Sequence, residues 1–290
     1  MGTRCERAMA VDLRVGCCGL PISLAGYAKE FRLVEVQQTF YQPPRGRTLE
    51  KWRREVPQEF EFTIKAWQLI THEASSPTYR RLREKLDEDR KREAGAFRLN
   101  TTAMTAFERT LECARILSSK VILFQCPARF VPNPEHKSNL RAFFTEIRAG
   151  LQEHKAGQDL TFVWEPRGEW KAEEVEELCE ELSLVRGIDP LSQPPAPSVS
   201  GPVRQLSPGA PTSLGPAQGG LRSPQNSAVG TPALPRGLGY FRLHGRGGYN
   251  YRYTDGDLAQ LLEAARHRHT CYVLFNNVFM LEDARRFLKL

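Results

Sequence analysis

The chain has 290 residues, of which 40% are apolar, 9% aromatic and 26% charged. This composition is typical of a globular protein with a sizeable core, and it excludes a collagen, a coiled coil and a wholly disordered chain. The formal net charge of +7, from 41 basic and 34 acidic residues, favours anionic ligands or nucleic acid but does not choose between them.

The sequence predicts neither a membrane span nor an export signal. Its apolar stretches, such as residues 121–124, are far shorter than the ~20 residues of a membrane-spanning helix. The N-terminus lacks the apolar region of a secretory signal, and Glu6 breaks the myristoylation pattern. Seven cysteines without a CxxC pair argue against a disulfide framework. We therefore expect a cytoplasmic protein with no membrane partner.

The sequence predicts strands that alternate with helices along most of the chain. We expect strands at residues 13–17, 33–37, 60–65, 120–125, 160–165, 184–188, 239–244 and 271–276. Amphipathic helical patterns cover residues 22–31, 48–55, 101–118, 135–154, 171–182, 255–268 and 281–290. Strands separated by helices pair in parallel through right-handed crossovers. Eight such units favour a TIM-like (β/α) barrel, and an open doubly wound sheet is the alternative.

A charged segment at residues 79–98 lies between the third strand and its helix. Its basic and acidic residues are mixed at spacings of three and four. This pattern predicts a solvated helix with internal ion pairs. The alternative is a basic rim that guides a phosphate-bearing ligand to the barrel mouth.

Residues 190–237 differ from the rest of the chain, because they are rich in proline and glycine and contain no aromatic or acidic residue. Such a segment cannot bury enough apolar surface to offset its ordering entropy. We predict a disordered insertion after the sixth strand, either a spacer or a Pro-rich ligand for a protein partner. Without it about 240 residues remain, close to the ~250 of one barrel. Residues 1–10 are expected to be a flexible N-terminus and residues 11–290 a single domain.

Polar side chains follow seven of the eight predicted strands, where a parallel barrel carries its reactive groups. Glu35, Glu165 and His244 are the candidate catalytic acids and bases. Candidate substrate-binding residues, several of them suited to clamping a phosphate or carboxylate, are Lys65, His72, Gln125, Arg167, Arg242, Arg246, Asn276 and Asn277. Each could instead form a structural ion pair or hold backbone amides. Their recurrence at one end of the strands favours a polar, anion-binding pocket.

Two further chemistries compete with this anion-binding pocket. Glu35, Glu165, Asp189 and His244 could bind a metal, but the sequence has no HxH, HExxH or similar ligand pair, so we predict no metal site and name no cofactor. Cys17, Cys18 and Cys126 follow strands and could be redox-active. Adjacent cysteines form a disulfide only with strain, however, and free cysteines are usually buried hydrophobes.

The strand-end motifs together resemble one family. VEVQQTFY resembles its VEINSTFY, FEFTIKAWQLITH its FxFxVKxxxxITH, LFQCPARF its LxQLPPSF, WEPRGEW its EFRHxSW, YFRLHGR its YxRLHGR and VLFNN its YxYFNN. The order matches from about residue 12 to 290 apart from the insertion, and identifies the YecE-like family, domain of unknown function 72. The resemblance implies a TIM-like barrel but no reaction. It implies a pocket of Glu35, Thr39, Tyr41, Lys65, His72, Gln125, Glu165, Arg167, Trp170, Arg242, His244, Gly245, Arg246, Asn276 and Asn277.

The chain departs from the family pattern at two places. Where relatives show Thr-Ser-Gly-Trp after the first strand, this chain has Gly-Cys-Cys-Gly-Leu at residues 16–20, and it loses an aromatic wall. Where relatives show Glu-Phe-Arg-His, residues 164–168 read Trp-Glu-Pro-Arg-Gly and the histidine is absent.

Three functions remain open on the sequence. The first is an enzyme acting on a small anionic substrate by acid/base chemistry. The second is a nucleic-acid-binding or nucleic-acid-processing barrel, for which Tyr249, Tyr251 and Tyr253 would form a stacking strip. The third is a non-catalytic scaffold that recruits a protein partner through residues 190–237.

Overall fold

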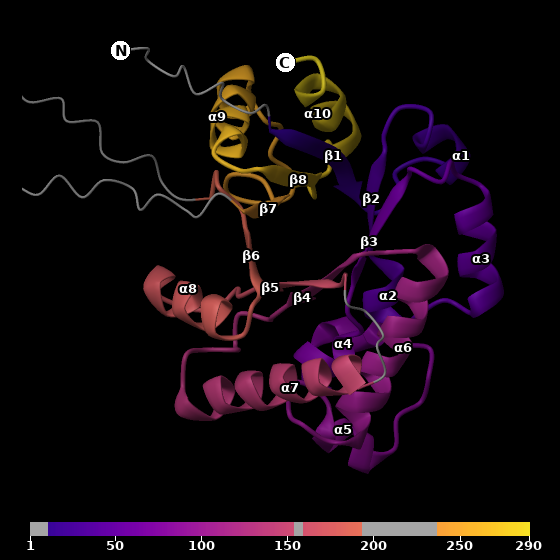
Figure 1. Ribbon diagram of the computed structural model, residues 1–290, viewed down its shortest axis with the longest axis vertical. Helices are drawn as coiled ribbons and strands as arrows, with labels where there is room; N and C mark the ends of the chain where they lie inside the picture. The colour runs from indigo at the N-terminus through magenta and orange to yellow at the C-terminus, as the bar shows by residue number, and fades with distance from the viewer. Residues whose placement is uncertain (1–10, 154–158, 193–236) are drawn as a thin grey trace, which may run out of the picture.

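The computed structural model describes residues 11–153, 159–192 and 237–290. Eight parallel strands close into a barrel in sequence order (Figure 1). They are β1 Asp12–Cys18, β2 Leu33–Val36, β3 Glu61–Lys65, β4 Val121–Gln125, β5 Thr161–Glu165, β6 Val185–Ile188, β7 Leu238–Leu243 and β8 Thr270–Phe275. The predicted TIM-like barrel is confirmed. The predicted N-terminal tail at 1–10, and the predicted insertion apart from residues 190–192 and 237, lie outside the described residues.

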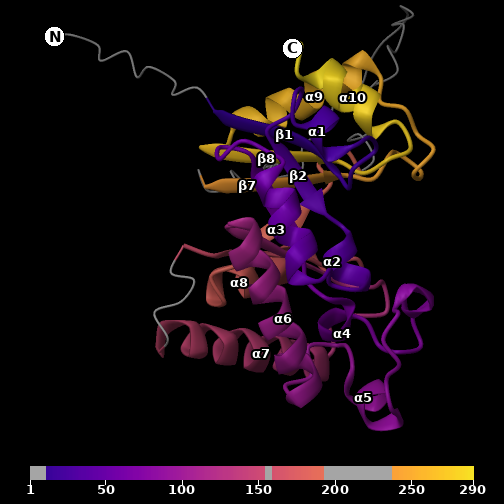
Figure 2. The same cartoon turned by 90° about the vertical axis from the view of Figure 1, so that its right-hand side faces the viewer.

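Helices surround the barrel (Figures 1 and 2). The long ones are α3 Gly46–Arg54, α6 Thr101–Leu117, α7 Pro134–Glu153, α8 Ala172–Glu181, α9 Asp255–Arg266 and α10 Met280–Phe287. The short ones are α1 Leu24–Tyr27, α2 Gln38–Tyr41, α4 Gln68–Thr71, the 3-10 helix η1 Pro77–Arg81 and α5 Glu88–Glu93. In the part of the chain that the structure describes, no helix is long and apolar enough to cross a membrane.

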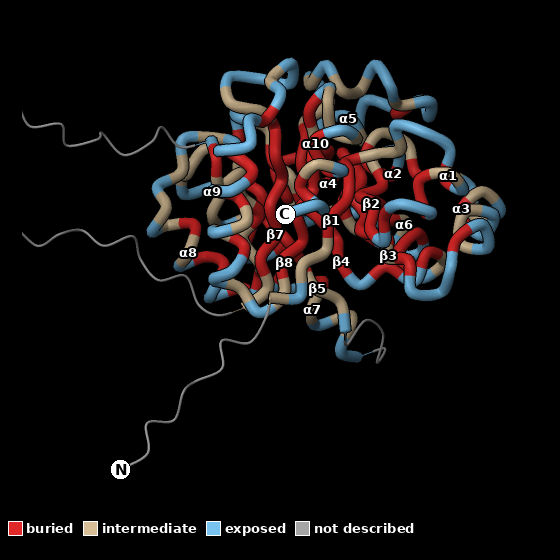
Figure 3. Tube along the Cα trace, turned by 90° about the horizontal axis from the view of Figure 1, so that it is seen from above, coloured by how far each residue is buried: buried red, intermediate tan, exposed pale blue. Residues whose placement is uncertain are grey.

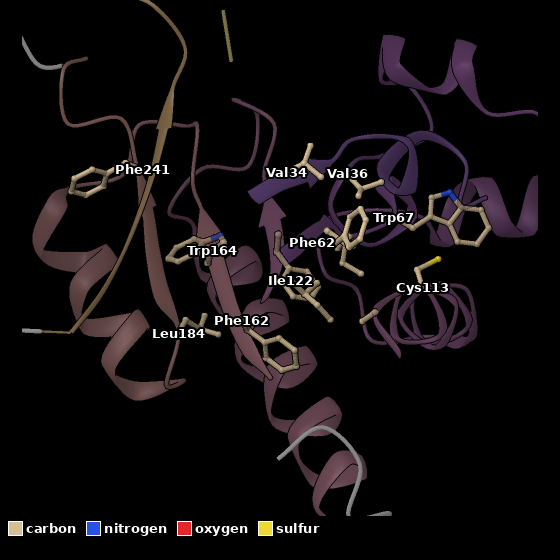
Figure 4. Close-up of a cluster of buried hydrophobic side chains, with 14 of the residues drawn as sticks. Val34, Val36, Phe62, Trp67, Cys113, Ile122, Phe162, Trp164, Leu184 and Phe241 are labelled. Atoms are coloured by element: carbon tan, nitrogen blue, oxygen red, sulfur yellow. The ribbon is translucent and has the colours of Figure 1, made fainter. Parts of the chain in front are cut away.

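Apolar side chains on the outer face of the strands form the main core. Phe62, Ile122, Phe162 and Trp164 point from the strands toward the surrounding helices, as the close-up in Figure 4 shows. The strands are buried and the outer faces of the helices are exposed (Figure 3). This two-sided burial explains why the strands read as nearly continuous apolar runs.

The barrel interior holds a smaller apolar cluster in its lower layers. Leu33, Leu123, Val163, Tyr240 and Leu274 belong to it. Because side chains alternate along a strand, the next inward position toward the carboxyl end falls on a polar residue in most strands. Above Leu33 this residue is Glu35, and above Tyr240 it is Arg242. The alternation therefore places the charged residues in one layer near the mouth.

Close backbone approach at the barrel wall depends on glycine. A Cβ atom on Gly16 would lie 2.2 Å from the carbonyl oxygen of Leu33, on the neighbouring strand. After β7, Gly245 has a φ of 88°, and a Cβ there would lie 2.1 Å from the carbonyl oxygen of Gly248. Glycine is the residue that accommodates both positions, since it lacks the Cβ atom.

The charged segment at residues 79–98 is less helical than its sequence predicts. It contains the end of η1 and the six residues of α5, joined by irregular chain. The predicted internal ion pairs are present, since Arg90, Lys91 and Arg92 each pair with an acidic residue of the segment. These pairs cancel much of the positive charge that a guiding basic rim would need.

Candidate functional site

Seven of the predicted site residues meet at the carboxyl ends of the strands. Five of them are the last residues of their strands whose side chains face the barrel interior. They are Glu35 on β2, Lys65 on β3, Gln125 on β4, Glu165 on β5 and Arg242 on β7. His244 and Asn276 lie just beyond the ends of β7 and β8. Hydrogen bonds join all seven into one network, so residues more than 200 positions apart in the chain contact one another.

Arg242 is the centre of this network. Its Nε and Nη2 atoms donate to the two carboxylate oxygens of Glu35, at 3.0 and 2.9 Å. Its Nη1 atom donates to Oε2 of Glu165 at 2.5 Å. Arg242 and Glu35 are fully buried, at 1% and 0% exposed, and Glu165 is 4% exposed. Such a guanidinium between two carboxylates fixes the spacing of three strands.

Glu165 is held as an ionised carboxylate. Burial alone would raise its pKa, but the charge of Arg242 and the hydrogen bond from His244 outweigh burial and hold its pKa well below the usual range. Its Oε1 atom also accepts from Gln125 at 2.8 Å and from Arg167 at 3.2 Å. With three donors around Oε1 and the Arg242 guanidinium at Oε2, Glu165 is poorly suited to accept a proton.

Glu35 is occupied in the same way. Besides Arg242, the Tyr240 hydroxyl donates to its Oε2 atom at 2.7 Å, and Gln37 Nε2 donates to Oε1. Tyr240 also lies 3.0 Å from the hydroxyl of Thr63. Sequence reasoning missed Tyr240. Its position two residues before Arg242, on the same face of β7, was the signal that could have identified it.

Lys65 differs from the other charged residues of the site. Among the described residues, its Nζ atom has one hydrogen-bond partner, Oε1 of Gln125 at 2.6 Å, and no carboxylate within ion-pair distance. The ammonium lies 3.8 Å from the centre of the Phe40 ring, a contact that the sequence did not predict. Burial and then the charge of Arg242 lower the pKa of Lys65 to about 7.

His244 is positioned by polar contacts at its backbone and at both ring nitrogens. Its backbone N–H donates to Asp189 Oδ2 at 2.8 Å, and its Nδ1 atom lies 3.0 Å from Nδ2 of Asn276. Its Nε2 atom lies 3.0 Å from Oε1 of Glu165 and 3.4 Å from Nη1 of Arg242. The amide of Asn276 donates to Nδ1, and the Nε2 proton is therefore directed at Glu165.

His72 lies beside Lys65 but outside the network. Its ring packs edge-on against Phe40, and its Nδ1 atom lies 2.8 Å from the hydroxyl of Thr71. Burial, followed by the charges of Lys65 and Arg129, lowers its pKa to about 3. At neutral pH His72 is therefore uncharged and contributes a polar, uncharged edge to the site.

Three predicted binding residues lie around or away from this network. Arg167 is on the rim, and 40% of its side chain is exposed. Arg246 turns toward α9, where Asp257 lies 3.0 Å from its Nε atom and Gln260 accepts from Nη2. Asn277 is buried and donates to Tyr251 and Asp283, so it anchors the loop before α10.

The predicted tyrosine strip does not form a common surface. Tyr253 is buried, and its hydroxyl accepts a hydrogen bond from the backbone N–H of Gly245 at 2.7 Å. Tyr251 donates to Asp257, and its ring contacts that of Tyr253. Tyr249 alone of the three is well exposed, at 54%. The alternation of tyrosines is therefore explained by loop packing.

The cysteines near the mouth are buried free thiols. Burial raises the pKa of Cys17 to about 12 and holds those of Cys18 and Cys126 above the usual range. A protonated buried thiol is a weak nucleophile. Within residues 11–153, 159–192 and 237–290, no three His, Cys, Asp or Glu side chains are grouped to hold a metal ion.

Comparisons with known proteins agree with this fold. The family model described as "Protein of unknown function DUF72" matches residues 20–290. A DUF72 family protein from Enterococcus faecalis V583 has 19% identity and a TM-score of 0.58, covering 96% of this chain and 97% of its own. A DUF72 family protein from Thermotoga maritima MSB8 has 19% identity and a TM-score of 0.56, covering 96% and 98%. No curated protein matches the chain. At these identities the solved structures show the fold alone.

Proposed function

Because the chain belongs to the DUF72 family of proteins of unknown function, we propose its activity from the site itself: an enzyme that acts on a small anionic substrate by acid/base chemistry. In this proposal Lys65 transfers the proton. Arg167 and Lys65 attract the phosphate or carboxylate of the substrate. Gln125, His244, His72 and Asn276 surround the reacting group.

The observation that carries the proposal is the unmatched ammonium group of Lys65. Arg242 is balanced by two carboxylates, whereas Lys65 faces one neutral amide and an aromatic ring. A buried cation without a carboxylate partner is unfavourable for stability, and such groups are retained at sites that bind anions or transfer protons. A pKa of about 7 also matches the range in which a general acid or base works best.

Glu35, Glu165 and Arg242 take a supporting role in this proposal. The sequence suggested Glu35 and Glu165 as acid and base, but hydrogen bonds occupy the oxygens of both carboxylates. Their negative charges instead keep Lys65 partly protonated, since both raise its pKa against the effect of burial. The three residues thus set the protonation of the reactive amine.

Proton exchange in D₂O tests the proposal. The protein is incubated with a panel of sugar phosphates and 2-oxo acids, and mass spectrometry measures carbon-bound deuterium. We expect exchange in at least one compound, and a loss of about 100-fold or more in Lys65→Met. Lys120→Met is the matched control, because Lys120 is exposed and precedes β4 at the opposite end of the barrel. An unchanged rate in Lys65→Met contradicts the proposal.

Salt dependence separates this function from nucleic-acid binding. A small anion that contacts one or two cations loses little affinity between low and moderate salt. A nucleic acid that contacts many cations loses affinity steeply over the same range. Steep loss of bound oligonucleotide, with no exchange in the small-molecule panel, would favour the nucleic-acid alternative.

A further inference from the structure

We propose that Lys65 acts as a nucleophile and forms an imine with an aldehyde or ketone that also carries a phosphate or carboxylate. The inference deepens the proposed function and rests on it, because it names the substrate class of the same site. It begins from the placement of Lys65 and from the groups that surround its amine.

Lys65 is the one lysine that is buried among the described residues. Its amine is at the end of β3, with Gln125 Oε1 on one side at 2.6 Å and the Phe40 ring on another at 3.8 Å. An amide oxygen and a ring face hold the nitrogen in place without an ion pair. An amine in such a setting keeps its lone pair available to an electrophile once a proton has left.

The charged groups around Lys65 come from three other strands. Arg242 on β7 opposes its protonation, while Glu35 on β2 and Glu165 on β5 favour it. The buried thiol of Cys18 on β1 is uncharged at neutral pH, since burial raises its pKa. His72 beside it is uncharged at neutral pH. Because burial and Arg242 prevail, a much larger fraction of Lys65 side chains than of ordinary lysines are free amines near pH 7.

The reaction is balanced without a further co-reactant. The ammonium of Lys65 first releases one proton, and the lone pair of Nζ then forms a bond to the carbonyl carbon while the C=O π electrons move to oxygen. The carbinolamine oxygen takes up the released proton and the second Nζ proton, and it leaves as water. The product is a protonated imine, which acts as an electron sink for bond breaking at the adjacent carbon. Gln125, which holds the ammonium at its Oε1 atom, positions the nitrogen for this attack.

Reductive trapping tests the inference on the full-length protein. The probe is glyoxylate, a small aldehyde that carries a carboxylate, and sodium borohydride reduces any imine to a stable carboxymethyl-lysine. Peptide mapping by mass spectrometry then compares the labelling of each lysine within the same sample. We expect Lys65 to be labelled about tenfold or more faster than Lys120 at pH 7, because its larger free-amine fraction outweighs its lower basicity. The labelling rate of Lys65 should rise with a midpoint near pH 7.

The outcomes separate the two levels of the proposal. Preferential trapping at Lys65, abolished in Lys65→Met without a fall in melting temperature, supports the imine. If Lys65 is labelled no faster than Lys120 while Lys65-dependent exchange in D₂O persists, the imine is overturned and the proton-transfer function stands. If both trapping and exchange are absent, both proposals fall.

Discussion

At the scale of single residues, Arg242 shows how the barrel tolerates charge in its interior. Desolvating three ionised groups is costly, and only their mutual attraction and hydrogen bonds offset the cost. Arg242 directs three nitrogen atoms at Glu35 and Glu165, and Tyr240 and Gln125 saturate further carboxylate oxygens. The network is therefore stable as a unit and sensitive to the loss of any one charge.

Replacing Arg242 with methionine should destabilise the protein strongly. Two buried carboxylates would face each other without a cation, and the loss of one partner from a buried pair typically costs about 3–5 kcal/mol. Urea unfolding measures the change. Arg141→Met is the control, since Arg141 pairs with Glu181 at a half-exposed site, where the loss should be below about 1 kcal/mol. Equal losses of unfolding free energy in the two variants would show that the buried network stabilises the protein no more than an exposed ion pair does.

Replacing Lys65 with methionine should stabilise the protein, and more so at neutral than at alkaline pH. The folded pKa of about 7 lies below the ordinary 10.5, so the folded state binds fewer protons than the unfolded state between these values. The titration of Lys65 therefore raises the free energy of unfolding of the wild type with pH through this window, by about 2 kcal/mol from pH 7 to pH 9. The advantage of Lys65→Met over wild type should shrink by the same amount.

Unfolding free energies at pH 7 and pH 9 check this sign, with Lys120→Met as the control for other titrating groups. Taking the difference between variant and wild type at each pH removes the contribution of the cysteines and tyrosines, which both proteins share. A difference between Lys65→Met and wild type that stays constant with pH would contradict the lowered pKa of Lys65.

At the scale of elements, the strands were predictable and the short helices were not. β3 and β5 are rich in β-branched and aromatic residues and end at a charged residue, so Lys65 and Glu165 mark their carboxyl ends correctly. The helices α2 and α4 are four residues long, which is too short for a helical period to show in the sequence.

The same element-scale limit applies to the site. Asn276 and Asn277 are adjacent after β8, but their side chains point in opposite directions. Asn276 hydrogen-bonds to His244, whereas Asn277 hydrogen-bonds to Asp283. Strand alternation predicts such opposite orientations but does not fix where the strand ends. The hydrogen bonds that occupy Glu35 and Glu165 depend on Arg242, some 200 residues away from Glu35, and no local pattern reveals them.

Gly16→Ala should weaken the contact between β1 and β2. The added Cβ would lie 2.2 Å from the Leu33 carbonyl oxygen, so the two strands would have to separate and the barrel would lose stability by about 1–3 kcal/mol. Gly150→Ala on α7 is the matched control. A Cβ there meets no atom within 4 Å, and alanine in a helix should add about 0.5–1 kcal/mol. Thermal and urea unfolding should therefore shift in opposite directions for the two variants.

At the scale of the whole molecule, the barrel closes across the break in the described chain. Ile188 pairs with Phe241 and Gly187 with Tyr240, although residues 193–236 separate β6 from β7 in the sequence. Leu191, at the start of the predicted insertion, is buried, so the described barrel extends slightly beyond the boundary predicted at Pro190. β6 and β7 thus complete the ring that brings Glu165 and Arg242 together.

Replacing residues 193–236 with a linker of about six residues should leave the barrel folded and slightly more stable. Closing a long loop costs more entropy than closing a short one, and the shortening should contribute about 1–2 kcal/mol. Urea unfolding measures the gain, and reductive labelling of Lys65 reports whether the site is intact. A loss of stability of similar size would show that residues 193–236 pack against the barrel, contrary to the spacer predicted from their composition. Unchanged stability with altered Lys65 labelling would instead place their effect at the mouth, where Asp189 connects the end of β6 to His244.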